Sequence, residues 1–292
     1  MPHSEIHILL TPVKMTLRRA CVMGHPVAHS RSPMIHGYWL KTLGIPGAYE
    51  LKDLSVEAFP AFITNLAGNG YVGGNVTVPH KEAAFRLVAG RDEAAEAIGA
   101  VNTLWLENGA LMGGNSDTHG FIANLDERAR GWDVPGCRAL VLGAGGAGRS
   151  AVYALKRRGA EVHVVNRTVS RAQDLAARFG VKAHGFDAVP RLLRDTDVLV
   201  NCTSLGLAGA PPLQIDLGPL KPSAVVYDVV YVPLETGLLA AARKRGHRTV
   251  DGLGMLLQQA GFGFRKWFGG NPKVTPELRA TVEADIVAKT AK

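Results

Sequence analysis

The chain has 292 residues, of which 47% are hydrophobic and 20% are charged. This length and composition exclude an intrinsically disordered protein and leave room for two folded domains. The formal net charge of +8 alone does not separate nucleic-acid binding from attraction of small anions or from a surface bias.

The start of the chain and its cysteines bear on the cellular compartment. Residues 1–18 lack the basic start and small-residue cleavage site of a secretory signal, and we expect a loose tail before the first strand. The sequence has no run of eighteen apolar residues, so no membrane span is predicted. Cys21, Cys137 and Cys202 lack CxxC spacing, so we expect three small core residues in a cytoplasmic protein.

The first half of the chain alternates short strands and helices from Arg19 to about Gly114. Ser32-Pro33 is a good N-cap followed by a good first helical position. The hairpin is predicted to turn at Asn108-Gly109. The strands are expected at 19–23, 48–54 and 71–78, the helices at 32–43, 56–68, 82–88 and 92–99, and the hairpin at 102–115.

A second series of strands and helices follows, and its regular alternation predicts a parallel sheet covered on both faces. The strands are expected at 138–143, 161–166, 198–203, 225–230 and 247–250, and the helices at 146–159, 169–179 and 235–246. Two tail helices, 254–270 and 276–292, have no following strand and should pack back on the first domain. We therefore predict an α/β fold of two domains, with a cleft that the chain crosses twice.

The strongest local motif is VLGAGGAGRS, in which Gly143, Gly145 and Gly148 satisfy GxGxxG between a strand and a helix. The first glycine permits a tight turn, the second lets a pyrophosphate approach the backbone, and the third lets the helix pack on the strand. The alternative is a glycine-rich turn without a ligand. We predict dinucleotide binding by the whole turn: Gly143, Ala144, Gly145, Gly146, Ala147 and Gly148.

The next strand ends in Asn166-Arg167-Thr168, where a fold that prefers NAD usually carries an acidic residue for the ribose hydroxyl. Arg167 can pair with a 2′-phosphate, and Asn166 and Thr168 can add neutral hydrogen bonds. The alternative for Arg167 is a solvated arginine at a strand end. We predict NADP as the cofactor.

Polar residues gather at the ends of predicted elements in the first domain. Ser30 and Ser32 precede a helix, whose free N–H groups favour an anion such as a carboxylate, although Ser32 alone could simply cap that helix. Asn75 and Thr77 are two apart on a strand and share a face. Further along come Lys81, Asn102 and Asp117. Together these groups suit a polyhydroxylated, carboxylate-bearing ring.

With these motifs the chain resembles the shikimate dehydrogenase family. The matching segments keep the family's order from Arg19 to about Gly270: GHPVAHSRSPMIH, GGNVTVPHK, GAVNT, GGNSDTHGF, GAGGAGRS, NRT, NCTSLGL, YDVVYVPLETGLL and GLGMLLQQA. The resemblance implies a substrate domain of residues 1–117 and 251–292, with an NADP-binding Rossmann domain of residues 118–250 inserted. It also implies reversible NADP-dependent reduction of 3-dehydroshikimate to shikimate, on the route to chorismate and the aromatic amino acids.

The resemblance implies Lys81 and Asp117 as the catalytic pair, with Lys81 as the acid or base. Implied substrate-binding residues are Ser30, Ser32, Asn75, Thr77, Lys81, Asn102, Asp117, Tyr231 and Gln259. The segments NCTSLGL and DGLGM should border the cleft and flank the nicotinamide. These two segments add Thr203, Ser204, Gly252 and Met255 to the cofactor site, and Val229 of the segment YDVVYVPLETGLL is added as well.

Two positions depart from the family pattern. Gly37 stands where the family usually has Asn, and Ser116 where it usually has Thr before the catalytic Asp. Both serines of the first motif are kept, which favours shikimate over quinate. His25 and His29 are expected to be core or loop histidines, and the reaction needs no metal.

Several alternatives remain at this stage. The Lys81–Asp117 pair could be an interdomain salt bridge. The enzyme could be an NAD-dependent quinate/shikimate dehydrogenase, or the chain could be a non-catalytic sensor of NADP or a metabolite. We expect a small-molecule substrate, no nucleic acid, no membrane, and a monomer or homodimer.

Overall fold

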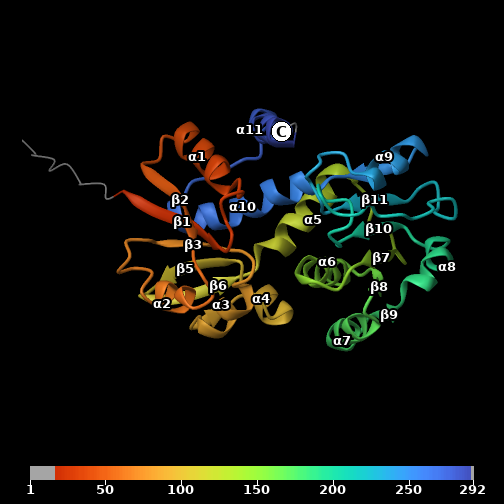
Figure 1. Cartoon of the computed structure of the whole chain (residues 1–292), viewed down its shortest axis with the longest axis horizontal. Helices are drawn as coiled ribbons and strands as arrows, with labels where there is room; N and C mark the ends of the chain where they lie inside the picture. The colour runs from red at the N-terminus through yellow and green to blue at the C-terminus, as the bar shows by residue number, and fades with distance from the viewer. Residues whose placement is uncertain (1–16, 291–292) are drawn as a thin grey trace, which may run out of the picture.

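The protein has two α/β lobes (Figure 1). The structure, a computed structural model, describes residues 17–290. The predicted loose tail lies almost wholly in residues 1–16, outside the described residues. Within the described part, no helix combines the length and apolarity needed to cross a bilayer.

The first lobe is built on a mixed six-stranded sheet with the order β2-β1-β3-β5-β6-β4. β1 pairs in parallel with β2 and β3, whereas β5 pairs antiparallel with β3 and β6. The hairpin turn is confirmed, because Asn108 and Gly109 both have positive φ, at 51° and 80°. The strands are β1 (Arg18–Gly24), β2 (Gly47–Asp53), β3 (Gly73–Val76), β4 (Gly90–Arg91), β5 (Thr103–Glu107) and β6 (Ala110–Gly114).

Helices from both ends of the chain cover this sheet, as predicted. Residues of α1 and of the two C-terminal helices share one buried cluster, which includes Trp39, Phe264 and Ile286. One prediction is corrected: Arg31 is the N-cap of α1, so Ser32 lies inside the first turn. The helices are α1 (Ser32–Thr42), α2 (Ala58–Thr64), α3 (Lys81–Leu87), α4 (Glu93–Ile98), α10 (Gly252–Phe268) and α11 (Pro276–Thr290).

The second lobe has a six-stranded sheet with the order β12-β11-β10-β7-β8-β9, and every pair in it is parallel, as predicted. Its strands are β7 (Arg138–Leu142), β8 (Glu161–Val165), β9 (Lys182–His184), β10 (Val198–Asn201), β11 (Val225–Asp228) and β12 (Arg248–Val250). Its helices are α6 (Gly146–Arg157), α7 (Val169–Phe179), η1 (Phe186–Ala188), α8 (Val189–Leu193) and α9 (Gly237–Lys244).

Short elements escaped prediction. β4 has two residues, and β9, η1 and α8 have three to five each. Elements this short carry little periodicity and are held by their neighbours in the fold. The prediction for the cysteines is confirmed, because Cys21, Cys137 and Cys202 are all free and buried.

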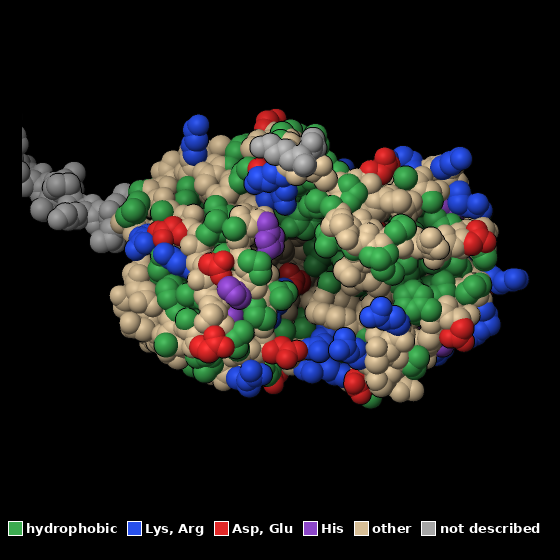
Figure 2. Space-filling view, viewed as in Figure 1, with side chains coloured by type: hydrophobic (Ala, Val, Ile, Leu, Met, Phe, Trp, Pro, Cys, Tyr) green, Lys and Arg blue, Asp and Glu red, His purple; other side chains and the backbone are tan. Residues whose placement is uncertain are grey.

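The two lobes meet along α5 (Ser116–Arg128), which packs against α10. Phe121 of α5 stacks on Tyr227 of the second sheet, with ring centroids 4.7 Å apart. Arg149 of α6 lies 3.1 Å from Glu82 of α3, and Arg157 pairs with Glu93 of α4. The surface between the lobes is hollowed (Figure 2).

Candidate active site

A cavity in the first lobe, here called the Lys81 cavity, collects polar side chains from distant parts of the chain. All nine residues that sequence analysis assigned to substrate binding line it: Ser30, Ser32, Asn75, Thr77, Lys81, Asn102, Asp117, Tyr231 and Gln259. The remaining lining residues are Val22, Val27, His29, Arg31, Val76 and Leu256.

The fold brings these residues together at the carboxyl ends of two neighbouring parallel strands. The chain leaves β1 and reaches Ser30 and Ser32, and it leaves β3 and reaches Thr77 and Lys81. Parallel strands end on the same edge of a sheet, and ligands of such sheets commonly bind there. Tyr231 reaches the cavity from the second lobe, because it follows β11 by three residues.

Lys81 and Asp117 form a direct ion pair in the cavity wall. The Lys81 Nζ donates to Asp117 Oδ2 at 2.7 Å, and the side chains are 27% and 17% exposed. Asn102 Nδ2 donates to the other carboxylate oxygen, Oδ1, at 2.9 Å. Lys81 opens α3 and Asp117 lies in the first turn of α5, where Asn115 caps the helix. The ammonium is therefore fixed in place while its surface remains accessible from the cavity.

Asn75 is held by three neighbouring groups. Its Oδ1 accepts from the Tyr49 hydroxyl at 2.7 Å, and its Nδ2 donates to the Asn102 carbonyl and to Thr103 Oγ1, both at 3.2 Å. Burial raises the pKa of Tyr49 well above its ordinary value, so Tyr49 remains a donor at neutral pH. The amide of Asn75 is thereby fixed with its oxygen toward Tyr49.

Ser116 lies beneath the other amides of the cavity. Its backbone N–H donates to Asn102 Oδ1 at 2.8 Å. Its hydroxyl lies 2.9 Å from Gln259 Oε1, 3.1 Å from Asn102 Oδ1 and 3.2 Å from Thr103 Oγ1. Ser116 is 1% exposed. The family usually has Thr at this position. Ser116 supplies the same hydroxyl group, which takes part in the hydrogen bonds of the cavity.

Four residues of this region were not predicted from the sequence: Arg31, Tyr49, Thr103 and His36. Arg31 lines the cavity and pairs with Asp285 of α11 at 3.0 Å. Its position between two assigned serines was an available signal. His36 is fully buried and stacks on Tyr49 at 4.1 Å, and burial lowers its pKa to about 3. It therefore packs as a neutral ring.

The departure at Gly37 lies away from the cavity. Gly37 is exposed, and a Cβ built on it meets no atom within 4 Å. It is absent from the cavity lining. The lack of an Asn side chain at position 37 therefore does not remove a polar group from the cavity wall.

The glycine turn, residues 143–148, joins β7 to α6 at the carboxyl edge of the second sheet. Gly143 has a φ of 103°, which only glycine adopts easily. A Cβ on Gly148 would lie 2.1 Å from the Gly143 carbonyl oxygen, so the helix needs this glycine to start there. A Cβ on Gly145 or Gly146 would meet nothing within 4 Å. The turn therefore leaves open space where a pyrophosphate would approach.

The other residues assigned to the cofactor lie along the same edge. Asn166 Oδ1 accepts from the Ala144 N–H at 3.2 Å, which ties the glycine turn to the end of β8. Arg167 and Thr168 follow and are exposed. Thr203 and Ser204 follow β10, Val229 follows β11, and Gly252 and Met255 open α10.

The strand order places this edge at the natural ligand position of such a sheet. The chain runs outward from β7 in both directions, to β8 and β9 on one side and to β10, β11 and β12 on the other. A crevice forms at the carboxyl ends where the order reverses, and dinucleotides bind there. Arg171 was missed. It is exposed on the first turn of α7, near Thr168, whose carbonyl accepts its backbone N–H.

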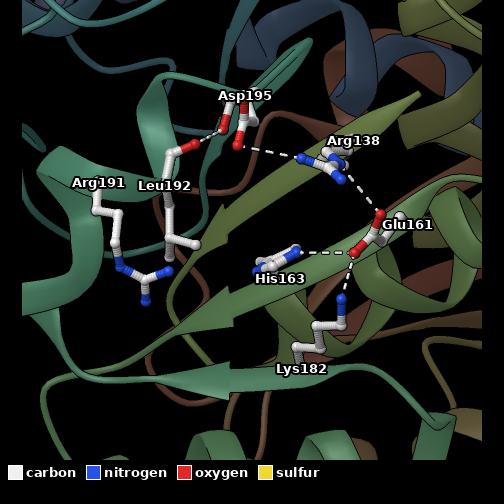
Figure 3. A pocket seen from close by; sticks show the side chains of 9 residues that line it. Arg138, Glu161, His163, Lys182, Arg191, Leu192 and Asp195 are labelled. Atoms are coloured by element: carbon white, nitrogen blue, oxygen red, sulfur yellow. Dashed lines mark hydrogen bonds and ion pairs between the residues drawn. The ribbon is translucent and has the colours of Figure 1, made fainter. Parts of the chain in front are cut away.

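A second cavity lies at the opposite, amino edge of this sheet (Figure 3). Arg138, His163 and Lys182 converge on Glu161, and Arg138 also pairs with Asp195 at 3.1 Å. Lys182 and His163 lower the pKa of Glu161 to about 2. Because Arg138 and Lys182 already face carboxylates and the cavity lies away from the glycine turn, we do not assign the cofactor to this cavity.

Comparisons with known proteins agree on one family. A family model described as the shikimate dehydrogenase substrate binding domain matches residues 22–104, and one described as shikimate / quinate 5-dehydrogenase matches residues 125–207. The shikimate dehydrogenase (NADP(+)) of Chelativorans sp. (strain BNC1) is 59% identical over 276 residues, which are 94% of this chain and 98% of that protein.

Two solved structures are similar to this chain in fold and sequence over most of its length. Shikimate 5-dehydrogenase from Thermus thermophilus, in complex with NADP(H) and shikimate, has a TM-score of 0.82 and 38% identity, covering 92% of this chain and 100% of that one. Quinate dehydrogenase from Corynebacterium glutamicum, in complex with NAD, has a TM-score of 0.84 and 30% identity, covering 92% of this chain and 99% of that one.

Proposed function

Because this chain belongs to the shikimate dehydrogenase family, we propose that it catalyses the reversible reduction of 3-dehydroshikimate to shikimate with NADP. The observation that carries the proposal is the Lys81 cavity, in which an ammonium–carboxylate pair lies among amides and hydroxyls. Tyr231 lines that cavity two residues after Val229, which lies at the cofactor edge. The proposed substrate and cofactor regions therefore adjoin at this point of the chain.

Ser30 and Ser32 are the proposed carboxylate ligands. Their hydroxyls lie 3.3 Å apart at the start of α1, where Ser30 Oγ also accepts the Ser32 backbone N–H at 3.3 Å and the N-cap residue Arg31 adds no side-chain cap. Asn75, Asn102, Asp117 and Gln259 are the proposed ligands of the ring hydroxyls. Thr77 and Tyr231 complete the wall. Each neutral hydrogen bond of this kind contributes about 0.5–1.5 kcal/mol to binding.

Lys81 is the proposed proton donor. When bound, the nicotinamide supplies a hydride to the ketone carbon, so the ketone oxygen must gain a proton. The Lys81 ammonium carries three donors, and Asp117 uses one of them. Asp117, itself held by Asn102, keeps the ammonium directed at the cavity. In the reverse direction the amine form of Lys81 takes the proton back from the hydroxyl. General acid–base catalysis of this type contributes about 10²–10⁴-fold.

The chain's own residues fit NADP. The glycine turn has open space at Gly145 and Gly146 and presents the uncapped start of α6. Arg167 is the proposed 2′-phosphate ligand, supported by its exposure and by the absence of an acidic residue at the end of β8. Asn166, Thr168, Thr203, Ser204, Val229, Gly252 and Met255 complete the proposed cofactor site.

The remaining proposals concern the domain boundaries, the oligomeric state and the cellular compartment. We propose residues 1–117 with 251–292 as the substrate domain and residues 118–250 as the cofactor domain, because α10 and α11 pack on the first lobe. We propose a monomer or homodimer in the cytoplasm. Three buried, free cysteines suit a reducing compartment.

Initial rates with two substrates and two cofactors test the proposal. NADPH formation, followed by its near-ultraviolet absorbance, is expected to be fastest with shikimate and NADP⁺. Faster oxidation of quinate with NAD⁺ would instead make the chain a quinate dehydrogenase. Tight binding of shikimate and NADP⁺ without any NADPH formation would make it a non-catalytic sensor.

A further inference from the structure

Thr103 holds a central place in the hydrogen-bond network under the Lys81 cavity although it does not line the cavity. It is the first residue of β5 and is completely buried. In the antiparallel pairing of β3 and β5 it lies directly opposite Asn75. Its hydroxyl has three polar neighbours: Asn75 Nδ2 at 3.2 Å, Asn102 Oδ1 at 2.9 Å and Ser116 Oγ at 3.2 Å.

The amide of Asn75 has no N–H left for a ligand. An Asn amide has two N–H donors and an oxygen with two lone pairs. Both donors of Asn75 are used, one by the Asn102 carbonyl and one by Thr103 Oγ1. Tyr49 takes one lone pair of the oxygen. A ligand therefore meets Asn75 as an acceptor.

Asn102 has the opposite polarity. Its Oδ1 accepts from the Ser116 backbone N–H at 2.8 Å and from the Thr103 hydroxyl at 2.9 Å, which fills both lone pairs. One of its N–H groups holds Asp117. The other N–H is left for a ligand, so Asn102 acts toward the cavity as a donor.

The saturation of Asn102 Oδ1 decides the direction of the Ser116 hydroxyl. Ser116 has one hydroxyl proton and two nearby amide oxygens, on Gln259 at 2.9 Å and on Asn102 at 3.1 Å. With both lone pairs of Asn102 Oδ1 filled, the proton goes to Gln259 Oε1. Gln259 must then turn its Nε2 donors toward the cavity.

We propose that Thr103 is a positioning residue that sets the hydrogen-bond polarity of the substrate site: an acceptor at Asn75 and donors at Asn102 and Gln259. This inference rests on the proposed function, since it concerns the same substrate. A hydroxyl group on the substrate ring that faces Asn75 must donate a hydrogen bond. The oxygens on the ring that face Asn102 and Gln259 must each accept one. Without the Thr103 hydroxyl, the Ser116 proton can turn to Asn102 and the Gln259 amide can rotate.

Three variants test this role. Thr103→Val keeps the shape and removes the hydroxyl, whereas Thr103→Ser keeps the hydroxyl. Thr196→Val is the matched control, because Thr196 is also buried and donates to the Leu192 carbonyl at 2.8 Å in the second lobe. For Thr103→Val we expect the KM and the Kd for shikimate to rise about twofold to tenfold, the range for one lost hydrogen bond. The Kd for NADP should stay unchanged.

Thr103→Ser should restore the shikimate KM to within about twofold of wild type, and Thr196→Val should leave it unchanged. Equal losses in Thr103→Val and Thr103→Ser, or an unaltered shikimate Kd in a folded Thr103→Val that still binds NADP, would overturn the proposal while leaving the dehydrogenase function intact. Calorimetric titration of the wild-type protein with shikimate distinguishes failure of this proposal from failure of the proposed function. A wild-type protein that binds shikimate without oxidising it contradicts only the proposed function.

Neutron diffraction of the wild-type protein provides a test that does not depend on the variants folding. The proposal requires two deuterons on the Gln259 nitrogen directed at the cavity and the Ser116 deuteron on the side of Gln259. A Ser116 deuteron directed at Asn102 would refute it.

Discussion

The proposed substrate site, which is the Lys81 cavity, and the proposed cofactor site at the glycine turn present different parts of the chain to a ligand. In the cavity, side chains line the proposed site, and a second layer behind them, made of Tyr49, Thr103 and Ser116, fixes their orientation. At the glycine turn, backbone and open space carry it, and exposed side chains such as Arg167 add charge. The substrate site therefore depends on distant packing, whereas the cofactor site depends on local backbone shape. This difference predicts different responses to mutation.

The largest effect is expected from Lys81→Ala. Removing the proposed acid should lower turnover at least about a hundredfold, the low end for lost acid–base catalysis. The Kd for NADP should remain within error of wild type, because Lys81 lies in the other lobe. Steady-state rates and fluorescence titration with NADPH measure the two quantities. Unchanged turnover would remove Lys81 from the mechanism.

Arg167→Ala should come next. A charge-assisted hydrogen bond contributes about 1.5–3 kcal/mol, so the affinity for NADP should fall about tenfold to a hundredfold. NAD lacks the 2′-phosphate, and its weaker binding should change little. Equal losses for the two cofactors would contradict the assignment of Arg167 to the phosphate.

The glycines offer a matched pair within a single turn. In Gly148→Ala, the new Cβ meets the Gly143 carbonyl at 2.1 Å, so the free energy of unfolding should fall by about 1–3 kcal/mol. In Gly145→Ala, the Cβ enters open space, so the protein should remain as stable as wild type and lose affinity for NADP. Thermal unfolding and NADPH titration separate them. If Gly145→Ala keeps full NADP affinity, the pyrophosphate does not approach there.

The smallest effect is expected from Tyr49→Phe. It removes the donor to Asn75 Oδ1 and keeps the ring that stacks on His36. The KM for shikimate should rise about twofold to tenfold, and turnover should change less. A fall in turnover with an unaltered KM would place Tyr49 in the catalytic step instead of behind the substrate.

Most features that depend on neighbouring residues in the chain could be predicted from the sequence. The glycine turn, the hairpin at Asn108-Gly109 and the parallel order of the second lobe follow from motifs and periodicity, and the family resemblance brought Tyr231 and Gln259 into the substrate set. Thr103 ends the segment GAVNT and follows Asn102, but its place in the sequence does not show that it meets Asn75, and no motif near Tyr49 marks that residue. Thr103 meets Asn75 through the antiparallel pairing of β3 and β5, and Tyr49 reaches Asn75 across β1. Arg31 was overlooked between its serines because its partner, Asp285, is 254 residues away.

We propose that the Lys81 cavity and the glycine turn act on one hydride transfer. A single turnover of the wild-type protein with 3-dehydroshikimate and NADPH that carries deuterium at both C4 positions of the nicotinamide tests this. The product should be shikimate with deuterium on the carbon that carried the ketone. Unconsumed NADPH, or shikimate without that deuterium, would contradict it.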